Sequence, residues 1–260
     1  MTLKMGKNAY IENEAYHADR EFLSSSAVKL LLDDEIEYFN KYVKGEKVEG
    51  KEFFDFGSLV HTMRLEPHLV QEEFAIFPGD KRNRAEYAEF CEANEGKIIM
   101  TANDYKAAAK LVAALKRHRL ANKLLDEGEP EIPYCTKLEG VPVKIKCDMA
   151  NVPLLVADLK TSSKPLNRRN LEEVCDMYDY DLSAAFYLDV LNKVCKTEME
   201  DFYFVFINKK SCQVKVAKAS KSMIARGRKK YKEGLKKYKR LTKSGFFDKI
   251  DMGEEYITLE

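Results

Sequence analysis

The spacing of apolar residues changes near residue 130, and this change constrains the fold more than any other feature of the chain. Between residues 28 and 42 apolar positions recur with helical spacing. After residue 130 come short apolar runs with the length of consecutive strands, at 131–138, 141–148 and 154–160. Glu139-Gly140 and Asn151 supply the turns between them. Helices followed by a meander predict an α+β or mixed α/β fold.

The remaining elements follow from the same patterns. Helices are predicted at 26–42, 55–67, 103–125, 169–194 and 221–242, and two further strands at 202–207 and 212–217. Ser24 to Ser26 predict the start of the first helix, because serine caps unpaired backbone N–H groups. We expect one domain over 1–260, with a mainly helical portion at 20–125, a core at 128–220 and a basic C-terminal helix and tail at 221–260.

Composition excludes several classes of protein. Hydrophobic residues make up 45% of the chain and charged residues 33%, which is typical of a globular protein rather than a disordered one. We expect no membrane helix, because no apolar run approaches the roughly 20 residues that one needs. The N-terminus does not look like a signal peptide. The six cysteines are scattered singly, which excludes a zinc ribbon and favours reduced thiols in the cytoplasm.

Positive charge is concentrated near the C-terminus. Residues 209–249 contain 16 Lys/Arg and two acids, although the whole chain has a net charge of +1. This asymmetry predicts a basic surface for a polyanion such as DNA, and a solvated lysine-rich helix is the alternative. The candidates for contacts with the DNA backbone are Lys229, Lys230, Lys232, Lys236, Lys237, Lys239 and Arg240.

One acid-x-lysine triplet stands out by its position. Four such triplets begin at Glu49, Glu95, Asp104 and Asp158, and only Asp158 lies in a strongly apolar strand. Because side chains alternate along a strand, Asp158 and Lys160 share one face, and their apolar neighbours point to the other.

A second acid is expected beside this pair. Asp148 ends the preceding predicted strand, and a hairpin turning near Asn151 would bring it close to Asp158. Two adjacent carboxylates repel each other, and a divalent cation relieves the repulsion. Mg²⁺ favours carboxylates, waters and phosphate oxygens, and Lys160 could orient a water or offset charge on a phosphate. The pattern predicts metal-assisted phosphodiester hydrolysis; the alternative is a structural Asp–Lys pair on a hairpin.

These residues resemble a known family. Asp148 followed by Asp158-Leu-Lys160-Thr161 resembles the PD-(D/E)XK nuclease core, and more specifically the RecE-type exonuclease VIII family of phage and prophage recombination enzymes. The resemblance covers about residues 20 to 220 and includes further motifs at 22–26, 56–61, 128–131 and 180–187. It implies a restriction-endonuclease-like core, with a central mixed sheet flanked by helices and an N-terminal helical portion.

The resemblance also implies roles for single residues. Asp148 and Asp158 match the catalytic metal-binding acids, and Lys160 matches the catalytic lysine. His61 and the backbone carbonyl of Leu159 match metal ligands. Glu131 matches a recurrent acid, with a surface role as the alternative, and Tyr187 matches the tyrosine of a Gln-x-x-x-Tyr motif, with simple helix packing as the alternative. The glutamine of that motif is Ser183 here, which puts substrate positioning by the motif in doubt.

The activity implied by the resemblance is specific. It is 5′-to-3′ digestion of linear double-stranded DNA, which leaves 3′ single strands for recombination. The reaction would require one or two Mg²⁺ (or Mn²⁺) ions. A ring-shaped homo-oligomer, a single-strand annealing partner and the cytoplasm of a bacterial or phage-infected cell are implied as well. The alternatives are a catalytically inactive DNA-binding module, a PD-(D/E)XK nuclease of RecB-like or CRISPR-adaptation context, and an unrelated α/β protein that binds a small metabolite.

Overall fold

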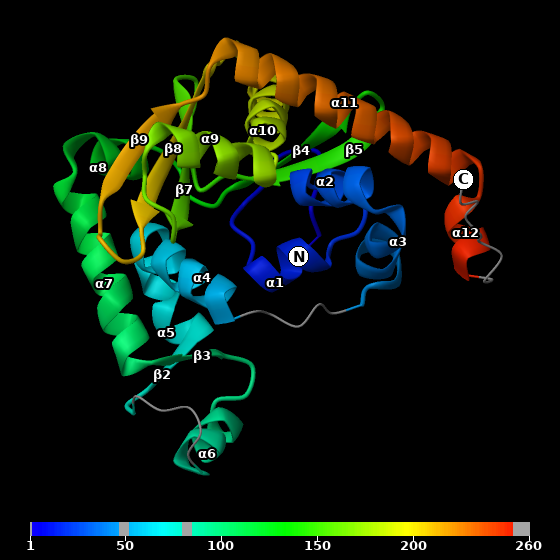
Figure 1. Cartoon of the computed structure of the whole chain (residues 1–260). Helices are drawn as coiled ribbons and strands as arrows, with labels where there is room; N and C mark the ends of the chain where they lie inside the picture. Colours follow the sequence, from blue (N-terminus) through cyan, green and yellow to red (C-terminus); the bar gives the residue numbers. More distant parts are fainter. Residues whose placement is uncertain (1, 47–51, 80–84, 252–260) are drawn as a thin grey trace.

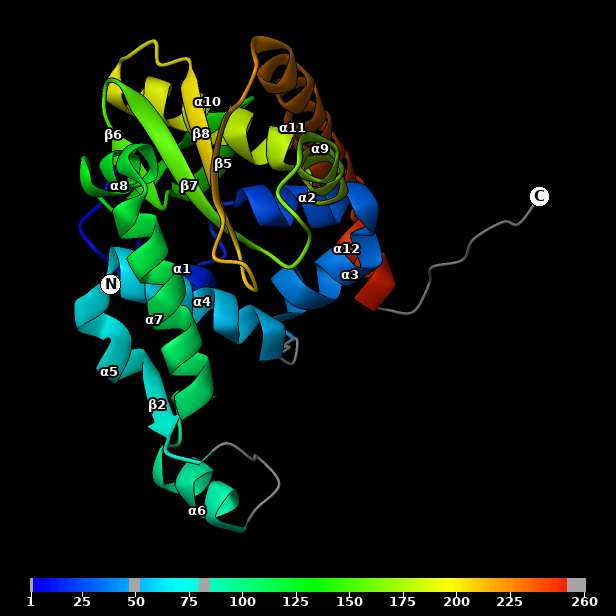
Figure 2. The ribbon, with the colours of Figure 1, turned by 60° about the vertical axis from the view of Figure 1, so that its left-hand side comes forward.

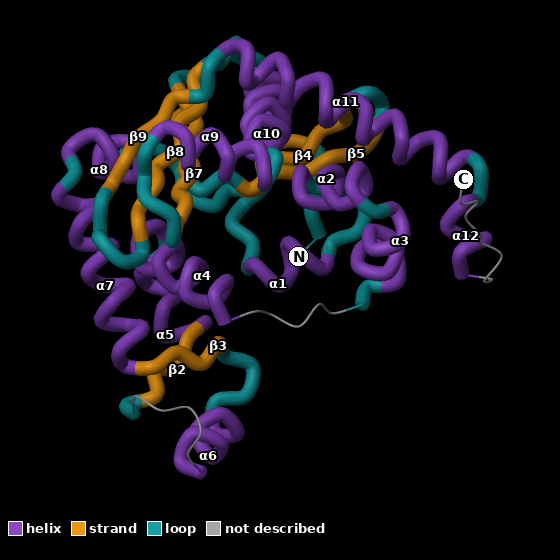
Figure 3. Tube along the Cα trace, in the orientation of Figure 1, coloured by secondary structure: helices purple, strands orange, loops and turns teal. Residues whose placement is uncertain are grey.

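A four-stranded mixed sheet, here called the central sheet, lies between two groups of helices (Figure 1). The computed structural model describes residues 2–46, 52–79 and 85–251. The strand order is β6-β7-β8-β9, with β7 parallel to β8 and the other pairs antiparallel. The strands are β6 (Met149–Asn151), β7 (Leu155–Ser162), β8 (Asp201–Asn208) and β9 (Val214–Lys218). Figure 3 shows helices on both sides of these strands.

The two faces of this sheet pack into two different hydrophobic cores. Side chains alternate along β7, so Val156 lies in one core and Ala157 and Leu159 lie in the other. The first core includes α2 (Ser25–Asp33) and α10 (Tyr180–Cys195). The second includes α4 (Glu52–Leu65), α7 (Ala102–Arg117) and α8 (Arg119–Asp126). Helices therefore cover both faces of the sheet, as predicted for this fold class.

A second sheet corrects one prediction of strand pairing. Its order is β1-β4-β5, with β1 (Gly6–Lys7), β4 (Pro133–Leu138) and β5 (Val141–Lys146) all antiparallel. The predicted strand at 141–148 ends early, at Lys146, and belongs to this sheet rather than to the sheet that contains β7. The chain then passes through Cys147 and Asp148 into the short strand β6, which forms the predicted hairpin with β7 near Asn151.

Polar residues divide two of the predicted helices. The helix expected at 26–42 becomes α2, α3 (Glu35–Tyr38) and a π-helical turn at Phe39–Lys44. Asp34 has extended backbone, and its side chain accepts bonds from the N–H groups of Ile36 and Glu37. The predicted serine cap of α2 is present, because Ser24 Oγ accepts from the N–H of Ala27. Likewise the helix expected at 103–125 divides at His118, whose side chain caps α8.

A left-handed residue divides the predicted helix at 169–194. Asp179 has φ = 47° and separates α9 (Arg168–Met177) from α10. The resulting turn, Tyr178-Asp179, lies between two helices that pack on the central sheet.

Several short elements had no counterpart in the sequence prediction. They are α1 (Asn13–Ala18), a 3-10 turn (Pro67–Leu69), α5 (Val70–Glu73), β2 (Phe74–Phe77), α6 (Ala85–Ala93), β3 (Ile98–Thr101) and α12 (Phe246–Asp251), together with β1 and β6. Strands β2 and β3 are parallel to each other. With α6 they form an arm that extends away from the rest of the molecule (Figure 2).

The basic helix α11 (Lys221–Lys243) packs across α10 and α2. Its apolar residues Ile224, Tyr231, Leu235 and Leu241 are buried in the first core. Residues 252–260 of the predicted tail lie outside the described residues. Within the described part of the chain, no helix is long and apolar enough to cross a membrane.

Candidate metal centre and substrate cavity

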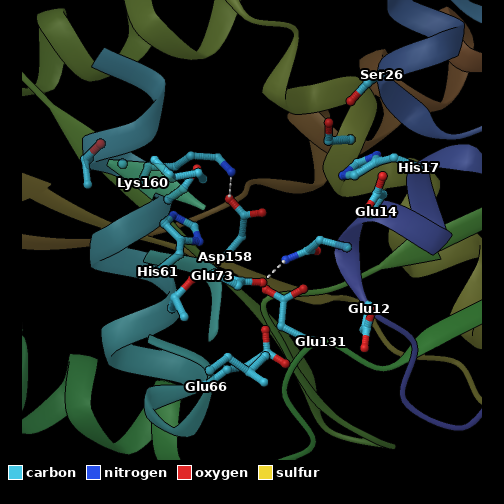
Figure 4. A pocket seen from close by; sticks show the side chains of 18 of the residues that line it. Glu12, Glu14, His17, Ser26, His61, Glu66, Glu73, Glu131, Asp158 and Lys160 are labelled. Atoms are coloured by element: carbon cyan, nitrogen blue, oxygen red, sulfur yellow. Dashed lines mark hydrogen bonds and ion pairs between the residues drawn. The ribbon is translucent and has the colours of Figure 1, made fainter. Parts of the chain in front are cut away.

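A cavity of about 1030 Å³ lies between the central sheet and helices α1, α2, α4 and α10. The predicted site residues His61, Glu131, Asp158, Lys160 and Tyr187 all line it. Figure 4 shows Asp158 and Lys160 of β7, His61 of α4 and Glu131 directed toward the same space. The structure therefore brings residues from distant parts of the sequence to one place.

Asp158 and Lys160 form an ion pair on β7. Oδ2 of Asp158 lies 2.5 Å from Nζ of Lys160, and the two side chains are 7% and 25% exposed. Burial raises the pKa of Asp158, and the Lys160 ammonium opposes this rise. Burial alone would lower the pKa of Lys160, but the Asp158 and Asp148 carboxylates outweigh it and hold that pKa above its usual value. Lys160 is therefore a cation at neutral pH.

Asp148 reaches the site from the bend between β5 and β6. Its Oδ2 accepts a 2.6 Å hydrogen bond from the N–H of Leu159, next to Asp158 in the chain. The same oxygen lies 3.4 Å from Nδ1 of His61 on α4. The predicted hairpin near Asn151 thus brings Asp148 close to Asp158, because β6 pairs with β7 so that Met149 lies opposite Ala157. The proposed ligand role of the Leu159 carbonyl stays a prediction.

Glu131 enters the site just before β4. Its backbone is left-handed (φ = 53°), and its N–H donates to the carbonyl of Cys147 at 3.0 Å. Its carboxylate lies 3.1 Å from Nζ of Lys146. Burial and the nearby Asp148 carboxylate raise the pKa of Glu131 to about 8. Both causes disfavour a negative charge that a bound cation would stabilise.

Three of these side chains could hold one metal ion. Ligand atoms of His61, Glu131 and Asp148 all lie within 4.8 Å of one another. Carboxylates suit Mg²⁺ and Mn²⁺, and an imidazole is compatible with transition ions such as Mn²⁺. The crowded carboxylates fit such an ion because it offsets their repulsion. Asp158 does not belong to this group; it lies beside it, paired with Lys160.

Ser183 and Tyr187 lie one turn apart on α10, and both line the cavity. The Tyr187 ring packs edge-on against Phe202 at a centroid distance of 6.3 Å. Burial, followed by the Asp158 charge, raises the pKa of Tyr187. Tyr187 therefore both packs on the core and borders the cavity, and its role in positioning substrate stays a prediction.

The predicted DNA-contacting residues of α11 do not line this cavity. Four of the seven contact other groups of the chain: Lys230 pairs with Asp179 and Asp181, Lys232 with Glu139, Lys237 with Glu35, and Lys239 with the Glu139 carbonyl. Lys229, Lys236 and Arg240 are exposed. Their contact with DNA stays a prediction.

Sequence reasoning missed other residues of the cavity wall. Asn13 on α1 contacts Lys146 on one side and Glu73 on the other, at 3.1 Å, so that α1 borders the metal centre. Lys29 and Tyr180 form part of the wall close to Lys160. Their positions depend on how α1 and α2 pack against the rest of the chain, and no local sequence pattern predicts that packing.

The sheet, its helices and this group of acids with a lysine define a PD-(D/E)XK-like domain, and the predicted fold class is confirmed. A solved structure from Eubacterium rectale, described as a "putative exonuclease", shares the fold: it has a TM-score of 0.68 and 14% identity, over 96% of this chain and 89% of that one. Residues 24–249 match the family described as "PDDEXK-like domain of unknown function (DUF3799)", and the chain belongs to this family. A search of curated proteins found no match.

Proposed function

We propose that this protein is a metal-dependent nuclease that hydrolyses phosphodiester bonds at the ends of linear double-stranded DNA. One observation carries the proposal: the His61, Glu131 and Asp148 ligand atoms converge within 4.8 Å beside the Asp158–Lys160 ion pair. The cavity of about 1030 Å³ that contains them has room for a nucleotide strand.

The side chains have separate tasks in this proposal. A divalent cation, when bound, supplies charge neutralisation at the phosphate and a more acidic water. Asp148, His61 and Glu131 hold the cation, and the Leu159 N–H orients Asp148. Lys160 carries a fixed positive charge close to the scissile phosphate and stabilises the charge that develops on its oxygens. Asp158 orients Lys160 and is available as a further ligand.

The finer features rest on the resemblance of the sequence motifs to the RecE-type family. They are 5′-to-3′ polarity, 3′ single-stranded products for recombination, Mg²⁺ as the ion, a homo-oligomeric ring, a single-strand annealing partner and a cytoplasmic location. The structural neighbour from Eubacterium rectale is described as a "putative exonuclease", and this description favours digestion from ends.

The test uses a linear duplex labelled at its 5′ or its 3′ ends, beside a closed circle, with and without Mg²⁺. We expect wild-type protein to degrade only the linear DNA, and Asp158→Asn and Lys160→Ala to lose roughly 100-fold or more in rate, because each removes charge from the reaction centre. The end label released first gives the polarity.

A matched control is available in the chain. Lys106 ends the Asp104-Tyr-Lys106 triplet on α7, is exposed and does not line the cavity. Lys106→Ala should retain full activity. Full activity of Lys160→Ala would overturn the proposal, and DNA binding without hydrolysis in the presence of Mg²⁺ or Mn²⁺ would favour the inactive DNA-binding module.

A further inference from the structure

The turn between α9 and α10 is held in an unfavourable conformation by two other helices. Asp179 is left-handed (φ = 47°), a conformation that costs about 1 kcal/mol or more outside glycine. Lys230 of α11 binds the Asp179 carboxylate at 2.5 Å. Lys29 of α2 donates a 2.7 Å hydrogen bond to the carbonyl of Tyr178. Contacts from both sides therefore fix the position of Tyr178, and conformations held in this way occur often at functional sites.

The Tyr178 side chain is the exposed end of an aromatic column. Its ring stacks on Tyr180 at a centroid distance of 5.7 Å and an interplanar angle of 23°. Tyr180 stacks on Phe204 with the same distance and angle, and Phe204 is buried. Tyr178 itself is 48% exposed and lines the cavity. The column thus runs from the hydrophobic core to the cavity and ends in an open aromatic ring.

This column contacts the catalytic lysine of the proposed site. Nζ of Lys160 lies 5.2 Å from the centroid of the Tyr180 ring, and Nζ of Lys29 lies 5.6 Å from it. Tyr178 is one stacking step farther along the column than the ring that Lys160 contacts. A planar group stacked on Tyr178 would therefore extend the column within the same cavity, two stacking steps from the ring that Lys160 contacts.

We propose that Tyr178 is a stacking platform for an unpaired nucleobase of the DNA strand that is cut. The inference rests on the proposed nuclease function and names its preferred substrate: DNA ends whose terminal bases are unpaired. An exposed tyrosine face accepts any of the four bases, because each base presents a π-surface. The platform positions the strand without reading its sequence, while Lys29 holds the turn that carries it.

The test measures stacking directly in metal-free buffer with EDTA. The probe is a short single-stranded oligonucleotide that carries 2-aminopurine at successive positions from each end, because stacking on tyrosine quenches its fluorescence. Wild-type protein should quench the fluorescence of 2-aminopurine at one terminal position of the oligonucleotide. Tyr178→Ala should abolish the quenching and bind about five- to 150-fold more weakly, the range found when aromatic stacking partners are removed. Tyr178→Phe should retain both properties.

The control and the turnover measurement separate this role from a structural one. Tyr105 on α7 is 37% exposed and does not line the cavity, so Tyr105→Ala should quench and bind like wild type. With Mg²⁺ present, Tyr178→Ala should raise KM for single-stranded or frayed ends and leave kcat within about threefold, because the metal centre is intact.

The outcomes for the two proposals differ. Wild-type quenching that Tyr178→Ala removes, without any hydrolysis, would retain the platform and reject the nuclease. Hydrolysis by wild type with equal quenching and affinity in Tyr178→Ala would reject the platform and retain the nuclease. Equal losses of quenching and affinity in Tyr178→Phe and Tyr178→Ala would also overturn the platform. The hydroxyl group rather than the ring would then be responsible for DNA binding.

Discussion

Glu131 has a strongly perturbed carboxyl group, and this gives the metal-free protein a defined pH dependence. Its folded-state pKa of about 8 lies above the ordinary value of 4.5. The neutral form is thus favoured in the folded state, and its contribution to stability is complete below pH 4.5 and is lost as the pH rises through about 8.

We expect Glu131→Gln to remove this loss of stability. At pH 8 to 9, without divalent ions, the variant should be more stable than wild type by on the order of a few kcal/mol, since one pKa unit corresponds to about 1.4 kcal/mol. Thermal unfolding across pH 5 to 9 measures the effect. Glu127→Gln, at an exposed ion pair with Lys123, is the control and should follow wild type. Parallel pH curves for Glu131→Gln and wild type would contradict the prediction.

The single residues of the site differ in how well the sequence reveals them. Asp158 and Lys160 were predictable, because strand alternation places them on one face and only one of four triplets lies in an apolar strand. Lys29 and Tyr178 were not, because they meet through a contact between α2 and the α9–α10 turn that spans 149 residues. Local patterns carry no information about such contacts.

At the scale of elements, the crossing of α11 over α10 depends on one glycine. A Cβ on Gly227 would lie 1.8 Å from the backbone carbonyl oxygen of Asp181, so the two helices could not keep their separation. At Gly234 the nearest atom, 2.5 Å away, is a side-chain carbon of Val28, which can move more easily.

We therefore expect Gly227→Ala to destabilise the fold by about 3 kcal/mol or more, and Gly234→Ala by less, although alanine favours a helix at both positions. Urea unfolding of the two variants provides a matched comparison. Equal stability of the Gly227→Ala variant and wild type would show that the helices cross differently.

Element boundaries were harder to predict than element types. The strands at 202–207 and 212–217 and the helix at 221–242 are present nearly as expected, because their apolar periodicity is continuous. Boundaries inside long periodic stretches were missed where one polar side chain, Asp34 or His118, caps a new helix. The four-residue strands β2 and β3 are too short for a period to be recognised, and they pair with each other across the α6 segment.

At the scale of the whole molecule, the cavity and the basic stripe of α11, formed by its exposed lysine and arginine side chains, are separate features. Truncation of the chain at residue 226 is unsuitable as a test of the stripe, because Tyr231 and Leu235 belong to the core. Substitution of the exposed residues Lys229, Lys236 and Arg240 avoids this problem.

Replacement of these three residues by glutamate should weaken duplex binding at low salt and reduce the salt dependence. The slope of log K against log salt should fall by about 0.9 for each DNA phosphate that the protein no longer neutralises. Fluorescence anisotropy over a salt series measures both. The control carries glutamate at Lys106, Lys110 and Lys116, which are exposed on α7. Identical slopes for the two triple variants would mean that the stripe is only a solvated helix face.

Strand β7 is shared by both hydrophobic cores and carries Asp158 and Lys160. A disturbance in either half of the protein, even one far from the cavity, therefore acts on the same eight-residue strand. Thermal stability and catalytic activity therefore depend on the same backbone segment. Engineering that stabilises either hydrophobic core must leave the position of β7 between the two cores unchanged.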